Sequence, residues 1–572
     1  MTRATAAAVL LCLVARAWAG GEVTACGSDV QTRAGLNLRD AVAGGGAVTF
    51  ACPAGTTLLV TMTHQLTSAV QIDGRGRITL KASPTVPMFR AGLSVPQVVF
   101  SNLAFGGAEA VPFGGVFEGV ATALELRNVT VRGVGKSPGS VFGFVAGTVI
   151  RANRILADSS HFSDNQGAVL LAPRLTIRKS EFRSNRGQPF MPDFVEEGDR
   201  AVVESSFFSG NGVSVWRGDL MIRNCQFNAN GLGSPAYGGA LVVGKRAAIE
   251  KSEFANNRAP NGAAIWLADG DLSLRRVNFS SNLASGVGGA LGVSSSTQPV
   301  DVTIRYSHFR DNQAATGGAI AFQQSSAVRA LQGLAVNFAR NTASNSGGAI
   351  DMRSGSVDLT RVQAVENKAG DTGGFIAAGL SQQGVRLSNA LVVRNVARVG
   401  GAYAGPRLEL VNATIADNQG AALALVGSHA ASAKLTNSII LRNAGGGCSF
   451  PVAGRFADGG YNIQFPGNDC GGSIPVVDPG LDSMYVPVPD SPARFAGNIS
   501  VCTAAPISGR DLLNEVRPKI PGRCAAGAIE NTIENHALRA LRRAEQPGRL
   551  AGLLGILNET RDGRGTGKRS DR

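Results

Sequence analysis

Residues 247–267 read AAIEKSEFANNRAPNGAAIWL, and residues 302–322 read VTIRYSHFRDNQAATGGAIAF. Both stretches contain Phe-x-x-Asn, followed by glycine and then by Ala-Ile. The pair recurs in steps of 19 to 30 residues, at Phe162/Asn165, Phe182/Asn185, Phe208/Asn211, Phe227/Asn230, Phe254/Asn257, Phe279/Asn282, Phe309/Asn312 and Phe338/Asn341. It continues, with another residue in place of Phe, at Ala364/Asn367, Val392/Asn395, Ile415/Asn418 and Ile440/Asn443. This internal repeat decides the fold.

Each repeat has apolar residues seven and five positions before the Phe and a small residue two positions before it. In the repeat of Phe227 these are Leu220, Ile222 and Cys225. Side chains alternate between the two faces of a strand, so the change of parity between the two sets predicts two short strands separated by a corner. The glycines after the Asn permit a tight turn, and Ala-Ile begins a third strand. The pattern therefore predicts an all-β, right-handed parallel β-helix of about 14 or more coils.

Equivalent residues of successive coils should then lie one above another. The Phe side chains are predicted to stack in single file inside the helix, and the Asn amides to bond from coil to coil, as they do in cross-β stacks. Cys225 occupies a small inward position that Ser fills in other repeats, so we expect a buried and unreactive thiol there.

The composition excludes several classes of protein. Of 572 residues, 74 are glycine, 24 are proline and 44% are hydrophobic, which fits neither collagen nor a disordered chain. Residues 1–19 contain Arg3, an apolar stretch and the small-residue site Ala17-Trp18-Ala19, which predicts a secretory signal peptide. No later apolar run is long enough to cross a bilayer. We therefore expect a secreted or cell-surface protein without a transmembrane segment.

Six cysteines fall into near pairs, namely Cys26 and Cys52, Cys448 and Cys470, and Cys502 and Cys524. These spacings fit local disulfides in an oxidising compartment, although spacing alone does not fix their connectivity. The predicted organisation is a signal peptide at 1–19, an N-terminal cap at 20–69, the β-helix at 70–448, a disulfide-stapled cap rich in Cys, Pro and Gly over the last coil at 449–530, and a basic, partly disordered tail at 531–572.

The repeats resemble the passenger repeats of chlamydial polymorphic outer-membrane proteins and of many bacterial right-handed β-helix proteins. The segments Asn437–Ile440, Gly459–Asn462, Asp478-Pro479, Ser491–Ala493 and Cys524–Glu530 resemble the choice-of-anchor Q domain of bacterial surface proteins. The resemblance covers roughly residues 25–530. It implies a secreted or surface-displayed β-helix, in a family that usually carries no assigned activity.

The formal net charge of +14 favours acidic partners, such as an acidic polysaccharide or a component of a cell surface. Four arginines stand four positions before the Phe, and alone they would form a track for a polyanion. The same column, however, reads Asp158, Arg178, Glu204, Arg223, Glu250, Arg275 and Arg305, and its signs alternate through six coils that lie about 5 Å apart. We therefore expect a ladder of ion pairs on an exposed corner, worth about 0.5 kcal/mol per pair.

Trp216 and Trp266 both follow the first apolar residue of the third strand, so both are predicted to face outward in one column with Val242 between them. Exposed tryptophans on a flat sheet are typical of interaction sites. Trp216, Val242 and Trp266 are therefore the predicted platform on which a sugar ring would stack. The alternative is that a neighbouring loop covers the two indoles.

An inserted loop between two coils holds the longest acidic feature, Asp193, Glu196, Glu197 and Asp199, and insertions on a rigid scaffold often carry function. The chain lacks the regular Asp pattern of a calcium solenoid, so neither a metal nor a cofactor is predicted. It also shows no nucleophile motif and no converging pair of carboxylates, so no catalytic residue is predicted.

These features predict a secreted or surface-exposed β-helix that binds extracellular partners, either a glycan or a host or cell surface, in the manner of an adhesin. The alternative is a polysaccharide lyase or hydrolase that acts on an acidic polysaccharide. No feature indicates binding of nucleic acid. The oligomeric state and the mode of anchoring stay open.

Overall fold

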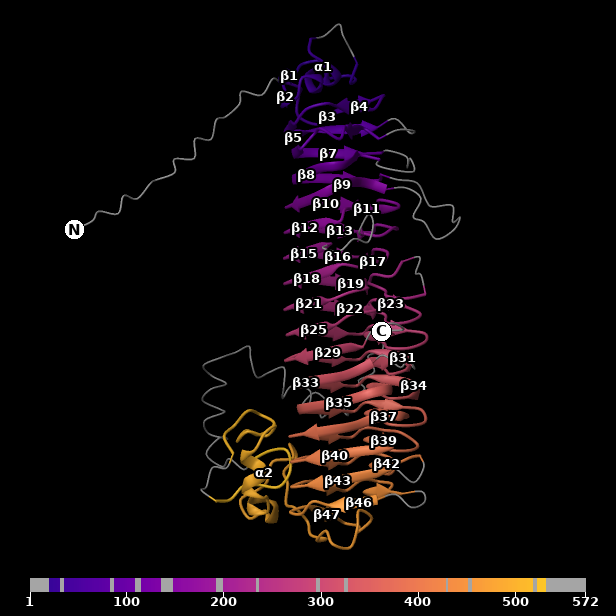
Figure 1. Cartoon of the computed structure of the whole chain (residues 1–572), viewed down its shortest axis with the longest axis vertical. Helices are drawn as coiled ribbons and strands as arrows, with labels where there is room; N and C mark the ends of the chain where they lie inside the picture. Colours follow the sequence, from indigo (N-terminus) through magenta and orange to yellow (C-terminus); the bar gives the residue numbers. More distant parts are fainter. Residues whose placement is uncertain are drawn as a thin grey trace, which may run out of the picture. The chain divides into compact units, whose positions relative to one another are not determined.

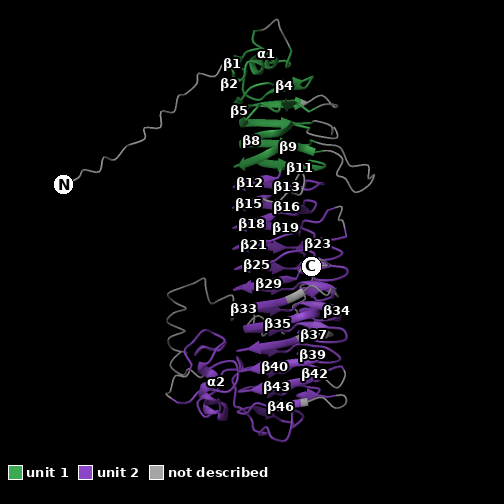
Figure 2. Ribbon diagram, in the orientation of Figure 1, with its two compact units in different colours: residues 1–172 green, residues 173–572 purple. Residues whose placement is uncertain are grey.

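The computed structural model describes residues 20–530, apart from 31–34, 83–86, 108–114, 135–147, 192–198, 233–235, 295–298, 324–327, 428–430, 451–454 and 518–521. The predicted signal peptide at 1–19 and the predicted tail at 531–572 lie outside the described residues. The chain forms two compact units, residues 1–172 and 173–572, which Figure 2 colours separately. Over the described residues both units are wound as a parallel β-solenoid, with about 15 turns between them, and this confirms the predicted fold class. None of the helices in this part of the chain is long and apolar enough to cross a bilayer.

The first unit is wound from parallel strands that pair with strands of the next coil. Its strands are β1 (Gly21–Val23), β2 (Gly46–Phe50), β3 (Thr56–Val60), β4 (His64–Leu66), β5 (Val70–Ala82), β6 (Phe89–Ala91), β7 (Gln97–Gly106), β8 (Phe117–Arg132), β9 (Thr148–Asp158), β10 (His161–Ser163) and β11 (Ala168–Leu171). One short helix, α1 (Leu38–Ala43), packs against β1 and β4. Because β1 already pairs in parallel with β2, and β2 with β5, the winding begins earlier than residue 70.

The strands of the second unit form three sheets, each made of parallel strands, which we call faces. The first is called the groove face because a groove lies on its outer side. It contains β12 (Arg174–Arg178), β15 (Arg200–Glu204), β18 (Asp219–Arg223), β21 (Ala247–Glu250), β25 (Leu272–Arg275), β29 (Val300–Arg305), β40 (Arg407–Val411), β43 (Ser432–Thr436), β46 (Arg455–Asp458) and parts of β33 (Val328–Ala339), β35 (Ile350–Val365) and β37 (Ile376–Ser388).

The phenylalanine face follows in each coil and carries the Phe of the repeat. It contains β13 (Glu181–Arg183), β16 (Phe207–Ser209), β19 (Gln226–Asn228), β22 (Glu253–Ala255), β26 (Asn278–Ser280), β30 (His308–Arg310), the ends of β33 and β35, β38 (Leu391–Val393), β41 (Thr414–Ala416), β44 (Ile439–Leu441) and β47 (Ile463–Phe465).

The third face contains β14 (Phe190–Met191), β17 (Ser214–Trp216), β20 (Leu241–Val243), β24 (Ile265–Leu267), β28 (Leu291–Val293), β32 (Ile320–Phe322), the starts of β35 and β37, β39 (Tyr403–Gly405), β42 (Leu423–Leu425) and β45 (Cys448–Ser449). A narrow sheet lines the corner before it, made of β23 (Arg258–Ala259), β27 (Leu283–Ala284), β31 (Gln313–Thr316), β34 (Thr342–Ser346) and β36 (Lys368–Ala369).

The Phe side chains of the repeat stack in single file inside the second unit, as predicted. Neighbouring ring centroids lie 4.6 to 5.2 Å apart in the series Phe182, Phe208, Phe227, Phe254, Phe279, Phe309 and Phe338. The corner between the groove face and the phenylalanine face is a single left-handed residue, such as Lys251 at φ 47° or Asn412 at φ 51°. That residue causes the change of parity that the sequence shows. At the next turn, a Cβ on Gly317 would lie 2.2 Å from the Ile320 oxygen, so only glycine fits there.

The segment after β47 extends further than the single coil that the sequence predicts, because it folds back along the phenylalanine face (Figure 1, yellow). It includes the short helices η1 (Pro492–Phe495) and α2 (Ile499–Thr503). The outer side of the phenylalanine face is polar at Asn278 and Asn337 but apolar at Leu391 and Ile439. These apolar residues pack against the folded-back segment in one buried cluster, which contains Ala339, Val365, Leu391, Val393, Ala416, Ile439, Leu441, Ile463, Tyr485, Val486, Ala493, Leu512, Ala526, Ala528 and Ile529.

Polar contacts fix the same segment to the left-handed corner residues of successive coils. Asn389 Nδ2 donates to the Arg510 oxygen at 2.6 Å, and Asn437 Nδ2 donates to the Asn498 oxygen at 3.2 Å. One coil before Asn389, the Arg361 guanidinium donates to the Asn514 side chain. The cap is therefore a clamp along several coils as well as a cover for the last one.

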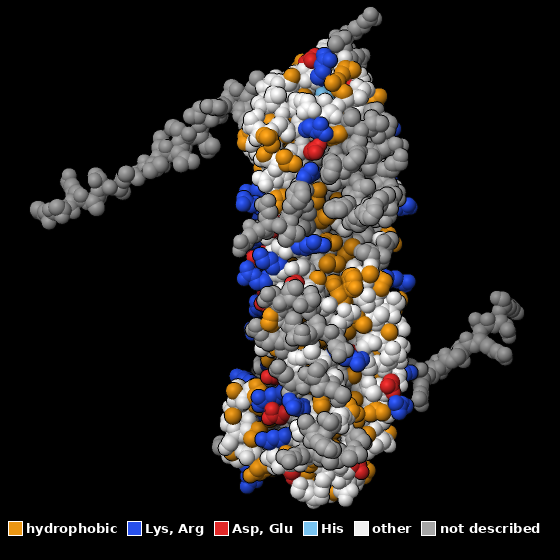
Figure 3. Space-filling view, turned by 45° about the vertical axis from the view of Figure 1, so that its right-hand side comes forward, with side chains coloured by type: hydrophobic (Ala, Val, Ile, Leu, Met, Phe, Trp, Pro, Cys, Tyr) orange, Lys and Arg blue, Asp and Glu red, His pale blue; other side chains and the backbone are white. Residues whose placement is uncertain are grey.

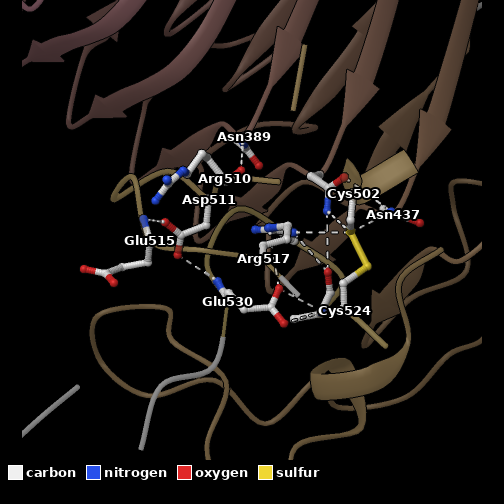
Figure 4. A network of polar contacts seen from close by, with 12 residues as sticks. Asn389, Asn437, Cys502, Arg510, Asp511, Glu515, Arg517, Cys524 and Glu530 are labelled. Carbon is white, nitrogen blue, oxygen red and sulfur yellow. Dashed lines mark hydrogen bonds and ion pairs between the residues drawn. A yellow bond between two sulfur atoms is a disulfide. The ribbon is translucent and has the colours of Figure 1, made fainter. Parts of the chain in front are cut away.

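The core of this cap holds a buried polar network (Figure 4). Arg517 is fully buried, and its Nη1 donates to the carbonyl oxygens of Ala525 and Gly527 at 3.1 and 3.2 Å. Burial lowers the pKa of the Arg517 guanidinium, and the Glu530 carboxylate, 3.5 Å away, opposes that effect. The Cys502–Cys524 disulfide lies beside this network, and Cys26–Cys52 and Cys448–Cys470 are also bonded, so all three predicted pairs are confirmed.

Candidate functional site

The outer side of the groove face carries a shallow groove of about 470 Å³ that crosses β15, β18, β21, β25 and β29. Successive coils contribute one equivalent residue each to its middle, and these are short side chains at Ala248, Ser273 and Thr303. Because these side chains are short, the surface between the longer charged residues on either side is hollowed. The groove therefore runs from coil to coil, across the strands.

A second hollow of about 270 Å³ continues the first toward the C-terminal cap. Thr303 lines both hollows, and the second is also lined by Arg305, Gln332 and Thr360. Pro506 of the cap lines it as well, so the folded-back segment borders this hollow.

One edge of the groove is formed by charged residues eight positions before the Phe of each repeat, at Arg200, Asp219, Arg246, Asp271 and Asp301. Arg246 Nη2 lies 2.9 Å from Asp219 Oδ2, and a second contact at 3.3 Å joins Nε to Oδ1. The Asp301 backbone N–H donates to Asp271 Oδ1 at 3.0 Å. The sequence analysis did not identify this edge. It did identify the ladder column, which lies four positions later in the same strands and in which positive and negative charges also alternate.

The predicted ladder of ion pairs runs along the same strands, two residues beyond the short side chains of the groove, and it is confirmed from Arg178 to Arg275. Glu204 lies 3.4 Å from Arg178 and 3.7 Å from Arg223, and Glu250 lies 3.6 Å from Arg223 and 3.5 Å from Arg275. The five side chains are between 28% and 52% exposed, so solvent screens each pair. Each pair therefore adds little to the stability of the fold.

The two tryptophans do not form the predicted exposed column, and that prediction is wrong. Trp216 lies in register with Val243, whereas Trp266 lies in register with Val242. A shift of one residue moves a side chain to the other face of a strand, so Trp216 points inward while Trp266 points outward. Trp216 is fully buried, and its Nε1 donates to the backbone carbonyl oxygen of Asp219 at 3.2 Å.

Trp266 does face outward, but another aromatic ring covers it, which was the alternative reading of the sequence. The Tyr237 ring lies 4.5 Å from the Trp266 ring, and only 5% of Trp266 is exposed. On the next coil a Cβ at Gly292 would lie 2.5 Å from the indole, so glycine leaves room for the ring. Tyr237 itself is 43% exposed. Figure 3 shows that some apolar side chains gather on one face of the molecule.

Most of the acidic loop lies outside the described residues, namely Asp193, Glu196 and Glu197. Asp199 is described and buried, and its backbone oxygen accepts the Asp219 N–H at 2.9 Å. In the described ranges, no group of three or more His, Cys, Asp or Glu side chains is arranged to hold a metal ion.

Cys225 is the free cysteine of the described residues, and it is buried in the inward column where the sequence places it. Burial raises the pKa of its thiol to about 12. The thiol is therefore protonated and shielded at neutral pH, which excludes it as a nucleophile.

No protein-family model and no curated protein matches the chain. The fold and the groove define the class: the chain is a parallel β-solenoid protein whose candidate site is a charged groove on the groove face of its second unit.

Proposed function

We propose that this protein is a secreted or surface-exposed β-solenoid that binds an extended extracellular glycan along its groove face. The observation that carries the proposal is the groove itself, which presents charged and polar side chains on successive coils about 4.8 Å apart. A polymer of sugar units would meet a new set of hydrogen-bonding groups at each coil. The three disulfides support an oxidising location.

The groove suits a polar polymer better than a globular protein partner. Charged residues line one of its long edges and the ladder of ion pairs runs along the same strands, whereas the cores of protein interfaces are depleted in charge. Ser273, Thr303 and Gln332 add uncharged donors and acceptors along its length. Hydroxyl groups of a glycan can bond to carboxylates and guanidinium groups that already form ion pairs with each other.

The test is to block the groove and measure glycan binding. Ala248→Trp places an indole in the middle of the groove, and we expect binding on an array of extracellular polysaccharides to be lost. Ala255→Trp is the matched control, because Ala255 faces outward on the phenylalanine face of the same coil and lies away from the groove. If both variants bind as the unmodified protein does, the groove is not the binding site.

A hydrolase is the second candidate, and one observation favours it. Asp271 and Asp301 occupy adjacent coils in one column of the groove edge, and glycosidases use two carboxylates beside the scissile bond. If this candidate is correct, incubation with an acidic polysaccharide releases new reducing ends without unsaturated products, and Asp271→Asn abolishes the release. If the protein binds a polymer but releases no product from it, the hydrolase candidate is wrong and the binding function remains.

A further inference from the structure

The alternation of charge on the ladder stops at one place, between β25 and β29. Arg275 and Arg305 lie directly opposite each other in register, where every preceding step of the second unit pairs an arginine with a glutamate. Arg275 has Glu250 on one side only, at 3.5 Å. Among the described residues, no carboxylate lies within ion-pair distance of Arg305, and the next coil supplies Leu334 at this position.

Like charges that stand opposite each other on neighbouring strands destabilise a sheet. The surroundings increase the excess of positive charge, because Lys251 and Arg276 occupy the adjacent left-handed corner positions and are exposed. Tyr306 follows them in the same corner position and is 42% exposed. A cluster of cations beside an exposed aromatic ring fits an anionic ligand that carries a ring of its own.

The cluster stands beside the second hollow of the groove face. Arg305 lines this hollow together with Thr303, Gln332 and Thr360, and Pro506 of the cap lines it as well. Asp358 also lines the hollow, and it faces the Arg386 guanidinium of the next coil. An acidic group of a polymer in this hollow would therefore lie beside Arg305 and one coil from Arg275, two arginines that the protein does not neutralise on their shared side.

We propose that Arg275 and Arg305 form an anion subsite that binds a carboxylate or sulfate group of an acidic polysaccharide lying in the groove. The inference rests on the proposed function, because it names the substrate class of the same groove. Guanidinium groups suit this role, since they bind carboxylate and sulfate oxygens in a bidentate manner. The interruption of the ladder then serves binding, and its cost in stability is offset when the ligand is bound.

The test compares three probes with the full-length protein: polygalacturonate, which carries carboxylates, a sulfated galactan, and a neutral galactan. Arg305→Gln should weaken binding of the charged probes about tenfold, which is the effect of losing one charge-assisted contact, and should leave the neutral probe unaffected. The relative loss for polygalacturonate and for the sulfated galactan identifies the anion. Arg398→Gln is the matched control, because it removes an exposed arginine that forms an ion pair with Asp371 and lines neither hollow of the groove face.

Arg305→Glu separates a binding role from a structural one. This variant continues the alternation beyond Arg275, so the melting temperature should stay equal or rise while binding of the charged probes is lost. Equal affinity of Arg305→Gln and the unmodified protein for both charged probes would overturn the subsite while leaving glycan binding intact. If Arg305→Gln loses the charged probes but Ala248→Trp retains them, the anion binds at the corner and the proposed groove function fails instead.

Discussion

The side-chain oxygen of Asn257 accepts two hydrogen bonds from Asn230, one from its backbone N–H and one from its Nδ2, both at 3.0 Å. Asn257 Nδ2 in turn donates to Asn282 Oδ1 at 2.9 Å and to the Phe227 oxygen at 3.0 Å. The same pattern continues through the second unit from Asn185 to Asn443. Each amide thereby satisfies backbone groups at the buried corner where the chain leaves the phenylalanine face.

Asn257→Ala should lower the free energy of unfolding by about 3 kcal/mol, because it leaves a buried N–H and a buried carbonyl oxygen without partners. Denaturant unfolding followed by far-UV circular dichroism measures the change. Asn228→Ala is the control, since Asn228 is only half-buried and its oxygen accepts a bond from the exposed Asn256. A similar loss in both variants would contradict the special role of the buried column.

Arg223→Glu should lower the free energy of unfolding by about 1 kcal/mol, because it replaces two screened attractions with two repulsions. Adding Glu250→Arg in the same chain should restore part of the loss through a new pair between positions 223 and 250. The recovery should shrink at about 1 M salt, where charges are screened within about 3 Å. No recovery at low salt would show that the column does not act through charge.

Cys225 should not react with an alkylating reagent at pH 8 in the folded protein, because burial holds the pKa of its thiol near 12. In denaturant the thiol is exposed and should react. Comparison with Cys225→Ser isolates this residue: the two proteins should take up equal label when folded, and the unmodified chain one more label when unfolded. An additional label on the folded chain would mean that the column opens.

Leu391→Asp should release the C-terminal cap, since it places a carboxylate in the buried cluster between the phenylalanine face and the cap. We expect limited proteolysis to cut within residues 466–530 while the solenoid remains resistant. Asn278→Asp is the matched control, because Asn278 occupies the same column on a coil that the cap does not cover. Equal resistance of the two variants would show that this cluster does not hold the cap.

Much of the fold could be predicted from the sequence because each column repeats one physical requirement. The Phe and Asn columns recur often enough to fix register, and the ladder followed directly from that register. The prediction that Trp216 faces outward is wrong because the register of β17 differs by one residue from the one that the sequence comparison assumed. Ser214 and Trp216 face inward, at the positions that Ile265 and Leu267 occupy in β24. No neighbouring repeat carries Trp at this position, so nothing in the pattern revealed the shift.

The position of the cap was also missed, although its signal is present in the chain. The outer residues of the phenylalanine face change from polar to apolar at Ala339, and a solvent-facing column has no reason to do so unless another segment covers it. The groove depends in the same way on a column of short residues, at Ala248 and Ser273, whose significance appears only when the flanking charged columns are placed beside it.

The cap forms hydrogen bonds with Arg361, Asn389, Asn412 and Asn437, one on each of four consecutive coils, so it fits a fixed number of coils. Gain or loss of a whole coil before Ala339 keeps these contacts. Gain or loss of a coil between Ala339 and Phe465 would move the later contact residues away from their partners in the cap. Whole coils can therefore be added before Ala339, where β15 to β29 carry the first hollow of the groove, without disturbing the contacts of the cap.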